Sequence, residues 1–244
     1  MTELWYDETG DGPPVVLLHE GVVDSRIWDP VLPLLADRHR VVRYDQRGFG
    51  RSPLPDSPYS LVGDLMSVLD AAWIDQAALV GASRGGGIAL TAAVERPERV
   101  SALILAGSGL PGHRLEVGWS PEQIARWEAA DAAGDFEAMA ELDMEAWAPM
   151  GADPELRAMF VENAVGSNSE ETTTDEPVAD RVRDISVPTL VITASRDVPA
   201  INDVGALLAR EIPGARHAVI EEADHMIPWR TPEEFSHLIL DFLS

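Results

Sequence analysis

The stretch Leu79-Val80-Gly81-Ala82-Ser83-Arg84-Gly85-Gly86-Gly87 decides how this chain folds. Residues 77–80 are small and apolar and predict a short buried strand, while residues 88–94, rich in Ala and Leu, predict a helix. Between them the sequence fits G-x-S-x-G, a sharp strand-to-helix turn that exposes a serine hydroxyl. Such a turn strains the serine backbone and brings strand and helix so close that larger side chains two residues either side would collide. An ordinary glycine-rich turn has the same composition, so the rest of the chain must supply the partners of Ser83.

Strand and helix patterns alternate on both sides of this turn. The strand runs are rich in Val, Ile and Leu, which is typical of parallel strands covered on both faces. This alternation predicts an α/β fold with a mostly parallel, twisted sheet and helices on both faces. Ligands of such sheets bind at the carboxyl ends of the strands. The predicted strands are 4–7, 15–18, 40–44, 77–80, 100–105, 188–193 and 216–220, and the predicted helices of this part are 29–35, 59–72, 88–94, 200–212 and 231–242.

The alternation stops between residues 110 and 183, where no strand pattern occurs. Ser120-Pro121-Glu122-Gln123 fits a capping box with Pro at the first helical position, and Asp135 and Asp153 are suited to cap two further helices. We therefore predict a helical cap over residues 110–183. It is inserted into a core domain made of residues 1–109 and 184–244.

Composition limits the classes of function. The 244 residues suit one sizeable domain, and the formal net charge of −24 opposes binding to nucleic acid or to an anionic membrane surface. No apolar run approaches the ~20 residues that a membrane span needs, and the chain starts with Met1-Thr2-Glu3 rather than a leader pattern, so we expect a cytoplasmic protein. The absence of Cys excludes disulfides and thiolate chemistry.

All eighteen basic residues are Arg. A GC-rich coding sequence explains this usage, because it favours Arg codons. Adaptation to high salt is the alternative, because salt screens the repulsion within an acidic surface. A melting curve measured against salt concentration separates the two explanations.

Two further loops that follow predicted strands carry suitable partners for Ser83. Asp197 follows strand 188–193 after a short loop, and His225 follows strand 216–220. A serine nucleophile needs a base to take its proton and a carboxylate to orient that base, so the order Ser83, Asp197, His225 suits hydrolysis. Asp203 and Asp184 are rival carboxylates, but only Asp197 follows its strand closely.

With these loops in place the sequence resembles the α/β-hydrolase superfamily, in its small capped esterase-like branch. The resemblance covers nearly the whole chain and implies a nucleophile at Ser83, a general base and acid at His225, and an orienting carboxylate at Asp197. It also implies an oxyanion hole made by the backbone N–H groups of Gly21 and Arg84, with no cofactor and no metal. The motifs that carry it are Leu17-Leu18-His19, residues 44–52 (YDQRGFGRS), Gly81-Ala82-Ser83-Arg84-Gly85, Pro188-Thr189-Leu190-Val191 with Asp197, Asp224-His225-Met226, and Pro232-Glu233-Glu234-Phe235.

The sequence departs from the family pattern in two places. Glu20 stands where the family usually has Gly, beside the expected oxyanion donor Gly21. A carboxylate that pointed inward there would oppose an oxyanion, so we expect Glu20 to point outward or to pair with an Arg. Only one strand candidate precedes the first parallel strand, so we expect about seven strands rather than eight.

The resulting hypothesis is a cofactor-independent serine hydrolase. It would cleave an ester, thioester or lactone through an acyl-enzyme, in a small molecule with an apolar acyl or ring portion. Two alternatives stay open at this point. The same three residues support carbon–carbon bond hydrolysis or cofactor-free perhydrolysis, and the pocket under the cap also suits a non-catalytic ligand-binding protein.

Overall fold

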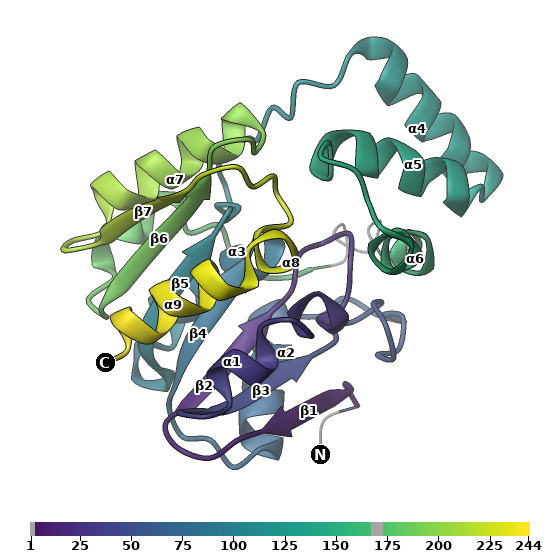
Figure 1. Ribbon diagram of the computed structural model, residues 1–244. Helices are drawn as coiled ribbons and strands as arrows, with labels where there is room; N and C mark the ends of the chain where they lie inside the picture. The colour runs from purple at the N-terminus through teal and green to yellow at the C-terminus, as the bar shows by residue number, and fades with distance from the viewer. Residues whose placement is uncertain (1–2, 167–172) are drawn as a thin grey trace.

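The structure is a computed structural model that describes residues 3–166 and 173–244 (Figure 1). Within these residues the strands form one seven-stranded sheet in the order β1-β3-β2-β4-β5-β6-β7. β1 runs antiparallel to β3, and every other neighbouring pair is parallel. The predicted sheet is confirmed, although its first strand starts at Tyr6 instead of Leu4. The strands are β1 (Tyr6–Thr9), β2 (Pro14–Leu18), β3 (Arg40–Tyr44), β4 (Ala77–Ala82), β5 (Val100–Ala106), β6 (Thr189–Ala194) and β7 (Arg216–Ile220).

Helices cover both faces of the sheet, because its inner strands are apolar on both sides. In β2, Val16 and Leu18 belong to one buried cluster, and Val15 and Leu17 belong to another on the opposite face. The first cluster includes side chains of α2 (Leu61–Ala71), α3 (Arg84–Glu95) and α7 (Pro199–Glu211), and the second includes side chains of α1 (Leu32–Leu35), α8 (Ile227–Arg230) and α9 (Pro232–Phe242). The strand ends are thereby held between two apolar layers.

One predicted helix differs in the structure. Residues 29–35 were expected to form a continuous helix, but the chain forms the 3₁₀ turn η1 (Ser25–Trp28) and the single-turn helix α1. Pro33 has no N–H to bond the carbonyl of residue 29, so the regular helix begins only at Leu32, with Pro33 in its first turn. Two other 3₁₀ turns, η2 (Pro97–Arg99) and η4 (Ala179–Asp184), precede β5 and β6.

Three helices lie between β5 and β6 in the chain, and Figure 1 shows them beside the layered core rather than within it. They are α4 (Pro121–Ala133), α5 (Phe136–Trp147) and α6 (Pro154–Asn163). Ser120 forms the expected capping box, and the side chains of Asp135 and Asp153 cap the other two helices. Each of these three helix starts agrees with the sequence prediction.

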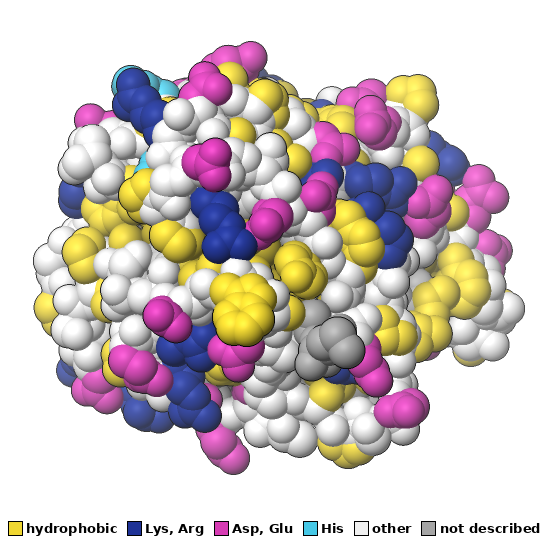
Figure 2. Space-filling model, turned by 90° about the horizontal axis from the view of Figure 1, so that it is seen from below, with side chains coloured by type: hydrophobic (Ala, Val, Ile, Leu, Met, Phe, Trp, Pro, Cys, Tyr) yellow, Lys and Arg dark blue, Asp and Glu magenta, His cyan; other side chains and the backbone are white. Residues whose placement is uncertain are grey.

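On one face of the molecule the acidic charge is dispersed (Figure 2). On the face drawn in Figure 2, Asp and Glu side chains alternate with Arg side chains instead of forming one block. Exposed pairs such as Arg157 with Glu141 add little to stability, because water screens them. No helix among the described residues is long and apolar enough to cross a membrane.

Candidate active site

Ser83 lies on the sharp turn between β4 and α3. Its φ of 51° and ψ of −114° are strained for a residue with a side chain. The flanking glycines are required by close contacts. A Cβ atom on Gly81 would lie 2.3 Å from the carbonyl oxygen of Gly85, and one on Gly85 would lie 2.1 Å from that of Leu18. The turn therefore has the tight strand–helix packing that the sequence predicts.

His225 and Asp197 form a buried pair at the ends of β7 and β6. The Nδ1 atom of His225 lies 3.0 Å from Oδ1 and 2.9 Å from Oδ2 of Asp197, and the two side chains are 2% and 0% exposed. The N–H of Val198 donates to Asp197 Oδ1 at 2.7 Å and fixes the carboxylate. Since a carboxylate only accepts, Nδ1 carries a proton, and Nε2 of the neutral ring is left as an acceptor.

Charge and burial act in opposite directions on His225. Burial lowers its pKa, but the charge and the hydrogen bond of Asp197 outweigh this effect, with smaller contributions from Glu20 and Asp224, so the pKa of His225 is raised. The protonated ring that forms when the histidine takes a proton is thereby stabilised.

The end of β5 connects Ser83 to this pair. The N–H of Ser83 donates to the carbonyl of Ala106 at 2.9 Å, and the N–H of Gly109 donates to the carbonyl of Ser83 at 2.9 Å. A Cβ atom on Gly107 would lie 3.1 Å from Asp197 Oδ2 and 3.3 Å from His225 Nδ1. Among the described residues no hydrogen bond joins the Ser83 hydroxyl to His225. Such contacts often tighten only when substrate is bound.

Gly21 and Arg84, the two candidate oxyanion donors, lie next to each other. A Cβ atom on Gly21 would be 3.2 Å from Cδ of Arg84. Arg84 is the first residue of α3, where backbone N–H groups have no partner within the helix and favour negative charge. Gly21 therefore packs against the side chain of the residue that follows Ser83.

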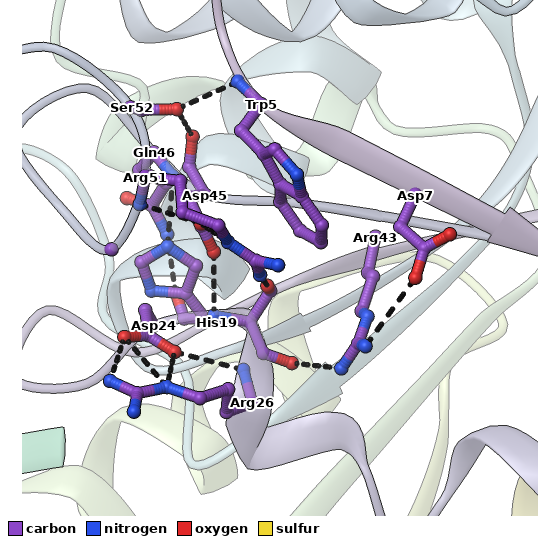
Figure 3. Close-up of polar contacts among 12 residues, drawn as sticks. Trp5, Asp7, His19, Asp24, Arg26, Arg43, Asp45, Gln46, Arg51 and Ser52 are labelled. Atoms are coloured by element: carbon purple, nitrogen blue, oxygen red, sulfur yellow. Dashed lines mark hydrogen bonds and ion pairs between the residues drawn. The ribbon is translucent and has the colours of Figure 1, made fainter. Parts of the chain in front are cut away.

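His19 holds the loop that contains Gly21. Figure 3 shows its ring among Asp24, Asp45 and Gln46. Its Nε2 atom accepts the N–H of Gln46 at 2.9 Å, so its Nδ1 atom donates to the carbonyl of Glu20 at 2.7 Å. Burial lowers the pKa of His19, which keeps the ring neutral in this role. His19 therefore bonds to loop backbone on both sides of its ring.

A second network ties α6 to the same loops. The side chain of Asn163 donates to Asp24 at 2.9 Å and accepts the N–H of Gly50 at 2.8 Å. Asp24 also binds Arg26 (Figure 3). Burial alone would raise the pKa of Asp24, but the hydrogen bonds from Arg26 and Asn163 lower it to about 2. Helix α6 is thus anchored to these loops through the negative charge of Asp24.

The expectation for Glu20 was wrong. Its side chain neither points outward nor pairs with an Arg: it is 0% exposed, and neither oxygen has a hydrogen-bond partner among the described residues. The arginines of the neighbouring loops are already engaged, Arg26 by Asp24 and Arg51 by Asp45. Burial raises the pKa of Glu20 to about 7. The charge of Asp197 adds to this rise, whereas the nearby N–H of its own backbone, which is outside hydrogen-bond geometry, and the charge of His225 oppose it.

Comparison with known proteins identifies the family. A model of the alpha/beta hydrolase fold family matches residues 13–232. The chain belongs to the α/β hydrolases. It is 29% identical to a pimeloyl-acyl-carrier-protein methyl ester esterase of Aeromonas hydrophila, over 96% of each chain. It is 28% identical to a 2-hydroxy-6-oxo-6-phenylhexa-2,4-dienoate hydrolase of Comamonas testosteroni, over 98% of this chain and 90% of the relative.

A solved structure agrees with this assignment. The enol-lactonase of Burkholderia xenovorans LB400 superimposes with a TM-score of 0.84 at 29% identity, over 98% of this chain and 96% of that one. The named relatives are hydrolases that share the fold and most of the chain length. This α/β hydrolase is therefore an enzyme that catalyses a hydrolytic reaction.

Two contacts of the hydrolase near His225 are not evident from sequence. The ring of Trp147, at the end of α5, lies 4.6 Å from the ring of His225, centroid to centroid. Asp224 is buried, binds Arg230 at 2.8 Å and accepts the N–H of Met150 at 3.1 Å. The position of Asp224 directly before His225 is a usable signal, but helical spacing does not distinguish Trp147 from the other Trp residues of this segment.

Trp147 also borders a cavity of about 460 Å³ in this hydrolase. The cavity is lined by Leu115, Trp119 and Ile124 among others. A second cavity, of about 350 Å³, lies between α2 and α3 and includes Arg84 and Leu110. Of these two cavities, only the one of about 460 Å³ is lined by Trp147, whose ring packs on His225. No group of three or more His, Asp or Glu side chains able to hold a metal ion occurs in the described part of the chain.

Proposed function

We propose that this hydrolase cleaves a carboxylic ester, thioester or lactone through an acyl-enzyme on Ser83. The observation that carries the proposal is the bond from His225 Nδ1 to Asp197, which leaves Nε2 as the base at the edge of the sheet where the strained turn presents Ser83. In this role Asp197 keeps the ring in the required tautomer and stabilises its protonated form.

The reaction has two halves. In the first, the Ser83 hydroxyl attacks the carbonyl carbon and its proton passes to His225 Nε2. The tetrahedral oxyanion then collapses, the bond to the alcohol, thiol or ring oxygen breaks, and that leaving group takes the proton from His225. In the second half, water attacks the acyl carbon, gives its proton to His225, and the acid leaves as Ser83 regains the proton.

The oxyanion of each half needs hydrogen-bond donors. We assign this role to the backbone N–H groups of Gly21 and Arg84. Arg84 is the first residue of α3, and Gly21 packs against its side chain. Each such donor lowers the barrier by about 2.7–4 kcal/mol. Both are backbone groups, so they are in place before the substrate arrives.

The cap, residues 110–183, is proposed to bind the apolar portion of the substrate. Trp147 joins the ring of His225 to the cavity with Trp119 and Ile124, so an acyl chain or ring can extend from the reacting carbonyl into it. The enol-lactonase and the methyl ester esterase among the relatives support an ester-type bond. A partner that is a small apolar molecule fits this lining.

A second reaction is favoured by one comparison. The relative from Comamonas testosteroni is a hydrolase of a phenylhexadienoate, which supports carbon–carbon bond cleavage of a vinylogous diketone by the same three residues. Single-turnover rates measured on a small ester and on a ring-fission diketone discriminate between the two reactions. Faster turnover of the diketone would assign the second one.

A fluorophosphonate probe tests whether Ser83 is the nucleophile. The wild type and Ser195→Ala, which removes a different serine at a strand end, should be labelled, whereas Ser83→Ala should not. Ester turnover should follow the same pattern, with a loss of about 10⁶-fold in Ser83→Ala. An unlabelled wild type would instead favour a non-catalytic binding protein, and substantial turnover by Ser83→Ala would refute the mechanism.

A further inference from the structure

Glu20 is the least expected group in the site. A carboxyl that is fully buried usually accepts several hydrogen bonds, and exceptions in native proteins call for an explanation. Both oxygens of Glu20 are buried, and neither has a partner among the described residues. A buried carboxyl in this condition costs free energy, so a further reason is needed for it to be there.

Its neighbours place Glu20 inside the candidate site. It precedes Gly21 in the chain, and its carbonyl is held by His19, so the backbone beside the carboxyl is fixed. The charges that act on Glu20 are those of His225 and Asp197, and Glu20 in turn acts on His225. The carboxyl is therefore buried beside Gly21 in the chain and within electrostatic reach of the histidine pair.

We propose that Glu20, in its protonated form, donates a hydrogen bond to the oxygen of the reacting carbonyl, as a third donor beside the N–H groups of Gly21 and Arg84. The inference rests on the acyl-transfer function proposed above. No atom is transferred in this step: the O–H of Glu20 stays on the carboxyl and shortens its contact to the oxygen as negative charge develops there. The substrate supplies the partner that the buried carboxyl lacks.

Only one protonation state of Glu20 can play this part. A carboxylate has no proton to donate, and its charge would repel an oxyanion formed at the adjacent donors. A carboxylic acid in an apolar setting stays neutral to a higher pH and donates well. Burial raises the pKa of Glu20 to about 7, which leaves a large protonated fraction at neutral pH.

A role as a carboxylate is the competing explanation. An ionised Glu20 would help to stabilise the protonated ring of His225, since its charge raises the pKa of that ring. The two roles predict opposite pH dependence above neutrality. Activity falls as Glu20 ionises if it is a donor, and rises or stays level if it acts through its charge.

The test is the pH profile of kcat/KM for ester hydrolysis, from about pH 5 to about pH 9. The wild-type profile should rise as His225 loses its proton and fall about tenfold per pH unit above the ionisation of Glu20. Glu20→Gln keeps a donor that does not ionise, so its descending limb should disappear.

Glu20→Leu removes the donor and should lower kcat by about 10²-fold with a smaller change in KM. Asp143→Asn is the matched control. Asp143 is also buried and lies in α5, outside the site. Burial raises its pKa to about 7, although the hydrogen bond from Trp127 acts in the opposite direction. The descending limb should persist in this variant.

Three outcomes would overturn the inference: a descending limb that persists in Glu20→Gln, equal kcat in the Gln and Leu variants, or a wild-type profile without a descending limb. The last needs no variant, so the inference stays falsifiable if a substitution at this buried position prevents folding. Labelling of wild-type Ser83 by the fluorophosphonate is measured in a separate experiment from the pH profiles. If labelling and turnover are normal while the pH profiles fail, only the role of Glu20 is wrong.

Discussion

The two sides of the candidate site differ in the hydrogen bonds that they make to a buried carboxyl group. The histidine wall, formed by Asp197 and His225, gives its carboxylate three short contacts, two from His225 Nδ1 and one from the N–H of Val198. The glutamate wall, formed by Glu20 and Gly21, leaves both carboxyl oxygens without a partner among the described residues. Burial alone therefore does not define what these groups do.

The difference separates a carboxylate held by hydrogen-bond donors from a carboxyl that has none. Its contacts suit Asp197 to hold and orient a histidine. A carboxyl without donors in the same low-dielectric setting favours its neutral form. One side of the site is built to stabilise positive charge on His225, and the other is free of a permanent negative charge where an oxyanion forms.

The largest expected effect comes from breaking the histidine wall with Asp197→Asn. In the variant the amide oxygen keeps the contact with the N–H of Val198, so the NH₂ group faces His225 Nδ1. It then donates to Nδ1 and forces the ring proton onto Nε2, which can no longer act as a base. We expect kcat for ester hydrolysis to fall by about 10⁴-fold while the fold is retained, measured by steady-state kinetics and circular dichroism.

Asp203→Asn is the control for that substitution. Asp203 lies in the same stretch of chain and is exposed. Its replacement should change kcat less than about twofold. A large loss in this variant together with a small one in Asp197→Asn would assign the orienting carboxylate to Asp203.

The sequence predicts the histidine wall and fails on the glutamate wall, for a physical reason. Ser83, Asp197 and His225 each follow a strand, and the carboxyl ends of parallel strands meet at one edge of the sheet, so local patterns suffice to bring them together. The same holds for the helix starts at Ser120, Asp135 and Asp153, where one side chain caps the adjacent backbone.

The burial of Glu20 and the contact of Trp147 depend on packing between distant segments. The direction of Glu20 depends on how His19 and Gln46 hold the loop and on which arginines are already engaged. The contact of Trp147 with His225 depends on how α5 packs beside the core. Neither arrangement has a periodic signature along the chain, so no local rule predicts it.

The glutamate wall can be tested through stability as well as rate. Glu20 has a raised pKa in the folded state, so it favours folding at pH below its unfolded value of 4.5, and this contribution is lost as the pH rises through about 7. The shift corresponds to about 3 kcal/mol. The free energy of unfolding of Glu20→Gln, measured by urea denaturation at several pH values, should show a smaller decline over this range than that of the wild type.

Asp143→Asn should remove a separate part of the same decline, because its pKa is raised to about 7 as well. The two effects should add, since the groups lie in different parts of the molecule. An unchanged pH dependence in Glu20→Gln would show that the carboxyl is already solvated or paired in solution.

The position of the histidine wall relative to the glutamate wall depends on Gly85. A Cβ atom at this position would lie 2.1 Å from the carbonyl of Leu18, directly before the loop of Glu20. Gly85→Ala must push α3 away from β2, so we expect a loss of roughly 2–3 kcal/mol in stability and a melting temperature lower by about 5–10 °C. Gly63→Ala, near the start of α2, is the control, because its new Cβ meets only the Ser60 side chain at 3.2 Å. Equal melting temperatures for the two variants would contradict the steric argument.

The smallest effect is expected at Trp147, which covers the histidine wall from the side of α5. Trp147→Ala opens His225 to water. Because burial lowers the pKa of His225, its pKa should rise further and the acidic limb of the pH profile should move to higher pH. Loss of apolar contact should also raise KM for long acyl esters by about tenfold, and less for acetyl esters.

Trp127→Ala is the matched substitution for this test. Trp127 packs between the helices of the same segment and donates to Asp143 at 3.2 Å, but it does not touch His225. It should lower stability without moving the acidic limb. If both Trp variants shift the limb equally, the shift reflects general loosening of the inserted helices. If only Trp147→Ala shifts it, the inserted segment contributes directly to the electrostatics of the histidine wall, and the two walls differ in their cover as well as in their hydrogen bonds.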